Sequence, residues 1–187
     1  SNFGGMENVG NTTIITEAAI IDQWTTDARL VYANAVIVHE FEHNHCGSDV
    51  TMATPFDMWL NEAFTVNIER EYQAEVFGAE YMRLYELDSI RDPSRGPLYE
   101  TETGTAGRIV RTGFDHPDDV VDGTTYVKAP EVLDILAKII GKEAYKRGTT
   151  KYFERYFGSN ASTADFLRCI AEEAPKAEKK VSASMKK

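Results

Sequence analysis

The strongest constraint on the fold of this chain is the segment from His39 to His43, which reads His-Glu-Phe-Glu-His. Four residues advance an α-helix by about 400°, so His39 and His43 lie one turn apart on one face and can bind a single metal ion. Glu40 is rotated by about 100° from His39 and cannot be a third ligand on that face. Its carboxylate is instead placed to take a proton from a water that the metal activates. The segment therefore predicts a helix with a catalytic zinc site and Glu40 as the general base.

A site with two histidines needs an acid from elsewhere, and Glu62 is the candidate for the third metal ligand. It follows His43 after 18 intervening positions, which is enough chain for a second helix to return across the first. Residues 54–57 (Thr-Pro-Phe-Asp) favour a helix start just before Glu62, because they combine a capping side chain, a proline in the first turn and an acid three residues on. A bare His-Glu-x-x-His match also fits two histidines that cap or fill a helix. The acid at a workable distance favours the metal site.

Two further segments extend the pattern: Gly-Gly-Met-Glu-Asn at positions 4–8 and Thr-Tyr-Val-Lys at positions 125–128. Together with the two helices they resemble the aminopeptidase N family of gluzincin zinc peptidases, most of all its bacterial alanyl aminopeptidase branch. Members of that family carry a G-[AG]-M-E-N motif, then H-E-x-x-H, a downstream N-E or K-E, and a catalytic tyrosine before a lysine. The order and the approximate spacing agree over roughly residues 3 to 174.

The resemblance implies roles for five residues outside the metal set. Tyr126 is expected to donate a hydrogen bond to the peptide carbonyl oxygen as that oxygen gains charge. Glu7 is expected to pair with the free α-ammonium of a peptide, so that single N-terminal amino acids are removed. The main chain at Gly4 and Gly5 can lie against the peptide, because small residues allow close approach, and Met6 contributes to the pocket for the first side chain.

The resemblance also implies the fold and the cofactor. We expect a mainly α (α+β) chain: a partial thermolysin-like zinc peptidase catalytic domain with a few short N-terminal strands. This domain fragment covers residues 1–174, and residues 175–187 form a flexible lysine-rich tail. One zinc ion per chain is expected, held by His39, His43 and Glu62. Full family members are several times longer, so we expect the N- and C-terminal domains of the parent protein to be missing here.

Composition excludes some classes of partner. A formal net charge of −10 argues against nucleic acid, which requires a basic face. No stretch approaches about 18 uninterrupted apolar residues, so we expect no membrane segment and a soluble protein, with the cytoplasm favoured. The two cysteines, Cys46 and Cys169, do not form a disulfide framework. Cys46 is disfavoured as a fourth metal ligand, because a closed fourth position would block catalysis, and His45 points to the other side of the helix.

Capping and composition patterns place the remaining elements. The zinc helix is predicted to begin at Thr26 or Asp27 and to end near Gly47. Residues 92–125 are rich in Gly, Pro, Asp and Thr and are predicted to be mostly loop that brings Tyr126 to the mouth of the site. Strands are predicted within 11–16 and 19–21, and further helices at 79–90, 130–140, 143–157 and 162–174.

Two other functions stay open from the sequence. The chain could bind metal and yet be an inactive catalytic-domain fragment, since missing strands could leave the site loose. It could also be an epoxide hydrolase like the leukotriene hydrolases, because the segment at positions 4–8 resembles theirs as well. An endopeptidase is less favoured, because an enzyme of that kind has no use for an amine-binding Glu7.

Overall fold

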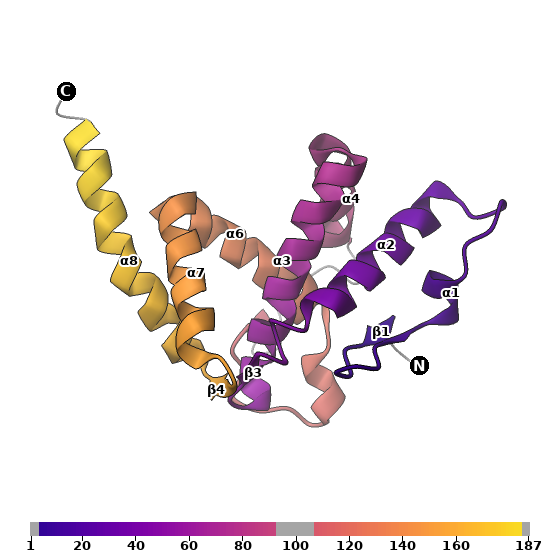
Figure 1. Cartoon of the computed structure of the whole chain (residues 1–187), viewed down its shortest axis with the longest axis horizontal. Helices are drawn as coiled ribbons and strands as arrows, with labels where there is room; N and C mark the ends of the chain where they lie inside the picture. Colours follow the sequence, from indigo (N-terminus) through magenta and orange to yellow (C-terminus); the bar gives the residue numbers. More distant parts are fainter. Residues whose placement is uncertain (1–3, 93–106, 185–187) are drawn as a thin grey trace.

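Most of the chain that the computed structural model describes, residues 4–92 and 107–184, is helical, and its strands are short (Figure 1). The first part consists of β1 (Gly5–Met6), β2 (Thr13–Ile14), α1 (Thr16–Ala19) and α2 (Asp27–Glu42). The middle part consists of β3 (Val50–Met52), the 3-10 turn η1 (Pro55–Asp57), α3 (Met58–Phe77) and α4 (Ala79–Arg91). The last part consists of the 3-10 turn η3 (Pro117–Val120), the π-helical turn η4 (Thr124–Lys128), α6 (Ala129–Ile140), α7 (Lys142–Tyr156), β4 (Ser159–Ala161) and α8 (Thr163–Ser184). The predicted mainly helical class is confirmed.

The two helices of the predicted site start where their sequences place them. The Thr26 side chain accepts a hydrogen bond from the backbone N–H of Arg29 at 3.4 Å and caps α2. After α2 the chain turns at Gly47, whose φ of +133° is one that residues with a side chain rarely adopt. Pro55 opens η1 and α3 follows directly. Glu62 therefore lies inside α3, as predicted.

Two predictions of local structure are wrong. Residues 19–21 are not a strand: Ala19 ends α1, and the next two residues have no regular structure. The short helix forms because Ala18 is buried as α1 packs on α2, so tertiary packing overrides strand propensity. The last helix does not stop at residue 174 but continues across Pro175 to Ser184. The alanine, glutamate and lysine residues that follow the proline favour helix. That residues 175–187 are flexible stays a prediction.

The predicted loop at residues 92–125 is confirmed where the structure describes it. Residues 93–106 of that segment lie outside the described residues, and from residue 108 to residue 122 the only regular element is the short turn η3. Predicted helices at 79–90, 130–140 and 143–157 correspond to α4, α6 and α7 within one or two residues at each end. Among the described residues no helix is both long and apolar enough to cross a membrane.

Helix α3 is the centre of the core because its first half is enclosed on all sides. Every residue from 59 to 66 is buried. Phe64 packs against Tyr152 of α7 and Phe166 of α8, with ring centroids 6.2 Å and 5.1 Å apart, and such aromatic pairs stabilise beyond their buried area. Figure 1 shows α7 and α8 side by side on the flank of the molecule opposite α2. This packing fixes the part of α3 that carries Glu62.

The turn between α2 and α3 is tied to the distant C-terminal part of the chain. Strand β3 pairs in parallel with β4, and the backbone N–H of Met52 donates to the side-chain oxygen of Asn61 at 3.1 Å. At the start of α3, one oxygen of Asp57 accepts hydrogen bonds from the backbone N–H and the hydroxyl of Thr163 at 2.8 Å and 2.7 Å. The connection between the two site helices is therefore held at several points.

An ion-pair cluster around Glu131 joins α3, α4 and α6. The guanidinium of Arg83 binds both carboxylate oxygens of Glu131 at 2.8 Å and 2.9 Å, and Arg70 binds one of them at 2.8 Å. Burial works to raise the pKa of the Glu131 carboxyl, but the hydrogen bonds and charges of the two arginines outweigh it, so this pKa lies below its usual value. Glu131 therefore stays ionised in the folded protein.

We expect Glu131→Gln to lower the free energy of unfolding near neutral pH by about 1 kcal/mol. A carboxyl whose folded-state pKa is lowered stabilises the fold above its unfolded-state pKa of about 4.5, and this contribution is lost as the pH falls through the folded-state pKa. Urea unfolding of both proteins from pH 7 downwards should show the gap closing in acid. The exposed Glu80 of α4 gives the control, Glu80→Gln; a gap that persists unchanged in acid contradicts the role of the ionised pair.

Candidate metal centre

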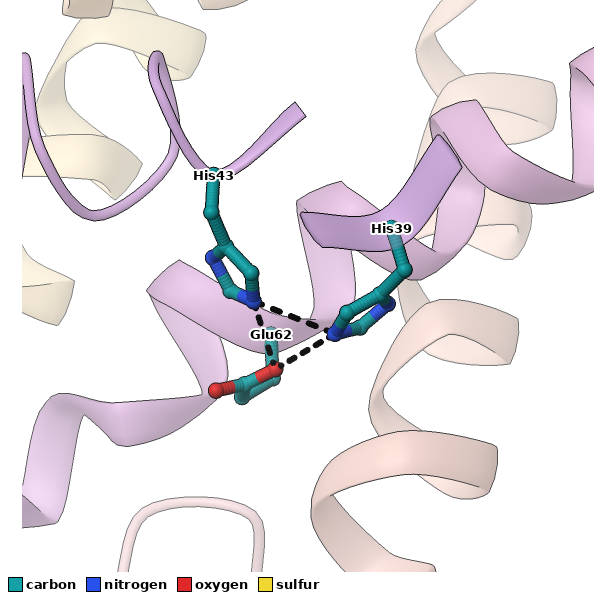
Figure 2. Close-up of side chains that lie close together, drawn as sticks. All are labelled: His39, His43 and Glu62. Atoms are coloured by element: carbon teal, nitrogen blue, oxygen red, sulfur yellow. Dashed lines mark hydrogen bonds and ion pairs between the residues drawn. The ribbon is translucent and has the colours of Figure 1, made fainter. Parts of the chain in front are cut away.

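Helix α2 packs across α3, and the crossing brings together the three predicted metal ligands (Figure 1). Figure 2 shows both imidazole rings turned toward the Glu62 carboxylate. The Nε2 atoms of His39 and His43 are 3.1 Å apart, and the Glu62 Oε2 atom lies 3.2 Å from the first and 3.3 Å from the second. The three side chains are 12%, 2% and 8% exposed. Three donor atoms thus form a nearly equilateral, almost buried triangle.

The size of this triangle fits a zinc ion. Zinc binds histidine nitrogen and carboxylate oxygen at about 2.0–2.2 Å with tetrahedral geometry, which separates neighbouring donors by roughly 3.3 Å. The other ring nitrogen of each histidine is already engaged, His43 Nδ1 with the backbone oxygen of Cys46 at 2.7 Å and His39 Nδ1 with Glu69 at 3.2 Å. Both Nε2 atoms are therefore the ones left for a metal. The donor set and its separation match a three-ligand catalytic zinc site.

The charges of the centre favour a cation. Burial works to raise the pKa of Glu62, but the hydrogen bonds and charges of the two histidines outweigh it and lower this pKa to about 2. Burial works to lower the pKa of His39 and of His43, yet the neighbouring carboxylates raise both above the usual histidine value. A buried carboxylate that stays ionised needs a positive charge beside it. Either protons on the imidazoles or a metal ion can supply it.

Glu40 lies beside the triangle and does not join it. Its side chain is buried. Burial raises the pKa of Glu40, although the charges of His39 and His43 oppose this. Oxygens of Glu40 and Glu7 lie with a nitrogen of His43 in a second group of possible metal donors, all within 4.8 Å of one another. A buried carboxylate with a raised pKa next to the donor triangle is suited to accept a proton.

The four residues predicted to hold substrate are placed differently from one another. Strand β1 packs against α2 so closely that a Cβ atom on Gly5 would lie 2.3 Å from the Glu40 Oε1 atom. A Cβ atom on Gly4 would lie 2.9 Å from the Tyr32 hydroxyl, so glycine is what permits this approach. Gly4 and Gly5 line a cavity of about 400 Å³ that also reaches the predicted site. Met6 is 44% exposed, and neither Met6 nor Glu7 is part of that cavity wall.

Tyr126 lines the same cavity as Gly4 and Gly5. It lies in the π-helical turn η4, directly before α6, and such turns recur at functional sites. Its ring is stacked on the His39 ring with centroids 6.0 Å apart. Burial and the nearby Glu62 carboxylate raise the pKa of the Tyr126 hydroxyl. The hydroxyl therefore keeps its proton and remains a hydrogen-bond donor.

A larger cavity of about 870 Å³ lies between α3, α4, α6 and α7, and none of the predicted site residues lines it. Its walls mix apolar side chains with acids and bases from all four helices, including Glu131 and Lys146. Size alone does not assign function to it. The smaller cavity is the relevant one, because it opens on His39, Glu40 and Tyr126.

The sequence analysis missed one residue of the centre, Glu69. It lies on α3 seven positions after Glu62, and its Oε2 atom is 3.2 Å from His39 Nδ1. Residues seven apart on a helix share a face, so this spacing from Glu62 was a signal available in the sequence. The two dismissed candidates are placed as expected. Cys46 has a buried thiol whose pKa is raised by burial, and His45 is exposed and paired with Asp49 at 2.9 Å.

Comparison with known proteins places this fold and site in a family. The family model for the peptidase family M1 domain matches residues 1–187. The chain is 30% identical to the aminopeptidase N of Caulobacter vibrioides over 173 residues and 30% identical to that of Streptomyces lividans over 174 residues, in each case 91% of this chain and 20% of the relative. The chain therefore belongs to peptidase family M1, and it resembles bacterial aminopeptidases N. It spans about a fifth of the length of these relatives.

Solved structures confirm the fold. The Legionella pneumophila aminopeptidase A, crystallised in complex with aspartic acid, superimposes with a TM-score of 0.78 at 24% identity, over 92% of this chain and 19% of that one. The native leukotriene A4 hydrolase of Saccharomyces cerevisiae gives a TM-score of 0.77 at 24% identity, over 97% of this chain and 28% of that one. Both similarities concern the fold, which is the one predicted.

Proposed function

We propose that this chain carries the active site of a zinc-dependent aminopeptidase, which removes N-terminal amino acids from peptides. The observation that carries the proposal is the triangle of His39 Nε2, His43 Nε2 and Glu62 Oε2, with sides of 3.1 to 3.3 Å, beside the buried carboxylate of Glu40. Membership of peptidase family M1 and relatives named aminopeptidase N support the reaction class.

His39, His43 and Glu62 would hold one zinc ion per chain. Bound zinc supplies a Lewis acid that polarises the peptide carbonyl and lowers the pKa of a water molecule toward about 7. Glu40 takes the proton of the attacking water and passes it to the departing amine, a role favoured by its raised pKa. The mainly buried setting strengthens each of these electrostatic contacts relative to water.

Glu7 and Tyr126 are the two further residues that act on the substrate. Glu7, half-buried beside Glu40, pairs with the free α-ammonium and so limits cleavage to the first residue. Tyr126 donates its hydroxyl hydrogen to the peptide oxygen, which gains negative charge as water adds. Gly4 and Gly5 let the peptide main chain approach strand β1 closely.

The partners that follow are peptides with a free N-terminus and the further domains of a longer protein. Three large apolar side chains on α6, Val132, Ile135 and Ile139, are 42%, 53% and 76% exposed. They recur at a spacing that forms one stripe along the helix, and apolar stripes of this kind are usually covered by protein. Relatives about five times as long contain chain that could cover it.

The direct test measures zinc content and hydrolysis of an aminoacyl reporter with the protein as given. One bound zinc with turnover of the reporter supports the proposal, and zinc without turnover supports an inactive metal-binding domain. Hydrolysis of an epoxide substrate with no release from the reporter supports a leukotriene-hydrolase-like activity, which the fold similarity to the yeast enzyme keeps as the second candidate. Absence of zinc binding overturns the metal site.

Glu40→Gln is expected to lower turnover by about 10²- to 10⁴-fold, the range that a general base contributes, while zinc content stays the same. The amide keeps the size of the side chain that packs on Gly5. Glu42→Gln, in the same motif, is the matched control and should retain activity. Equal turnover in Glu40→Gln and the wild type would remove Glu40 from the role of base.

Tyr126→Phe is expected to lower kcat by about 10²- to 10³-fold with a much smaller change in KM, because its hydrogen bond strengthens as charge develops in the transition state. Steady-state kinetics on the aminoacyl reporter measure both constants. Tyr72→Phe, on the exposed side of α3, is the control. A rise in KM with kcat unchanged would mean that Tyr126 only binds the ground state.

Glu7→Ala is expected to lower kcat/KM for free-amine substrates by about 10- to 100-fold, since a charge-assisted hydrogen bond contributes about 1.5–3 kcal/mol. The wild type should discriminate strongly against an N-acetylated reporter, and the variant should lose most of that discrimination. Glu17→Ala, an exposed acid of α1, tests for a general effect of removing charge. Undiminished discrimination in Glu7→Ala contradicts the ammonium contact.

A further inference from the structure

The His39 ring uses both of its nitrogens, one on each side. Its Nε2 atom faces Glu62 at 3.2 Å, and its Nδ1 atom lies 3.2 Å from the Oε2 atom of Glu69. Both acids belong to α3 and stand two helical turns apart. Their side chains are 8% and 16% exposed, so the ring is held between two largely buried carboxylates.

This arrangement fixes which nitrogen of His39 can bind a metal. An ionised carboxylate only accepts hydrogen bonds, so the Nδ1 atom facing Glu69 must carry the hydrogen. A neutral imidazole with its hydrogen on Nδ1 has its lone pair on Nε2, and this is the atom that faces Glu62 and His43. Glu69 thus selects the tautomer and the ring orientation that a metal requires.

The two histidines of the centre are supported differently. The Nδ1 atom of His43 donates to the neutral backbone oxygen of Cys46 at 2.7 Å, whereas that of His39 meets a charged side chain. A carboxylate partner makes the imidazole a stronger metal ligand than a carbonyl partner does, because the charged acceptor makes the stronger hydrogen bond. Glu69 is not itself a ligand, since neither group of convergent donors in the described chain includes it.

We propose that Glu69 is a positioning residue for the metal: through His39 Nδ1 it orients the ring, fixes its tautomer and raises the affinity for zinc. The proposal rests on the zinc site of the preceding subsection. A simpler alternative is that the contact only joins α2 to α3. In that case its removal would lower the stability of the metal-free protein and leave the affinity for zinc unchanged, so the two readings differ in a measurable quantity.

The test is the zinc dissociation constant of the whole chain, measured by competition with a chromophoric chelator, alongside urea unfolding of the metal-free proteins. Glu69→Ala is expected to weaken zinc binding by about 10- to 100-fold, the usual effect of losing the partner of a metal-binding histidine. Glu69→Gln is expected to weaken it less, by about 3- to 10-fold, because its amide oxygen still accepts the hydrogen bond but without charge. The control is Glu71→Ala, an exposed acid on the same helix, which should bind zinc like the wild type.

A second readout follows the ring itself. In ¹⁵N-histidine NMR spectra of the zinc-loaded wild type, His39 should carry its hydrogen on Nδ1, and its Nδ1–H signal should move in Glu69→Gln while that of His43 stays. Zinc affinity within twofold of the wild type in both Glu69 variants overturns the proposal, as does an equal loss in Glu71→Ala. If Glu69→Ala does not fold, the isosteric Glu69→Gln decides by the same criterion. A wild type that binds no zinc would instead overturn the proposed function.

Discussion

The rest of the structure depends on the crossing of α2 over α3, because the donor atoms of the centre come from both helices. Glu62 stands 23 positions after His39, and its carboxylate is almost fully buried. Burying a charge is unfavourable unless an opposite charge lies beside it, and here protons on the two imidazoles or the proposed metal ion would meet that need. The aromatic packing of Phe64 and the contact between Asp57 and Thr163 hold α3 in the position that this convergence requires.

Helix α3 carries both one of the proposed metal ligands and the residue proposed to orient another. It supplies Glu62 on one side of the His39 ring and Glu69 on the other, two turns apart on a helix whose first half is enclosed by the core. Because a helix enclosed in this way behaves as a rigid unit, it fixes the position of Glu62 and, through Glu69, the orientation of the His39 ring at the same time. The centre is therefore precise although the strands around it are only two or three residues long.

The small cavity beside the centre joins elements that are far apart in the chain. Gly5 of strand β1 lies against Glu40 with no side chain between them, Gly4 precedes it in the cavity wall, and the turn η4 contributes Tyr126 from more than a hundred residues later. The proposed exopeptidase activity depends on these segments lying together, because a base and a metal site alone would serve an endopeptidase equally well. Glu7, placed next to Glu40 by β1, is what ties the proposed chemistry to a free amino end.

The sequence by itself determined the helix that carries His39 and His43, the start of α3 before Glu62, and most other helix ranges, because these depend on helical periodicity and local capping. It did not determine that residues 19–21 avoid a strand, because the packing of α1 on α2 decided this, and it did not show that α8 continues to Ser184. Only the tertiary structure showed the distances between the three donor atoms, the π-helical turn that contains Tyr126 and the contact of Glu69 with His39. These depend on how helices cross and pack, which spacing along one chain does not specify.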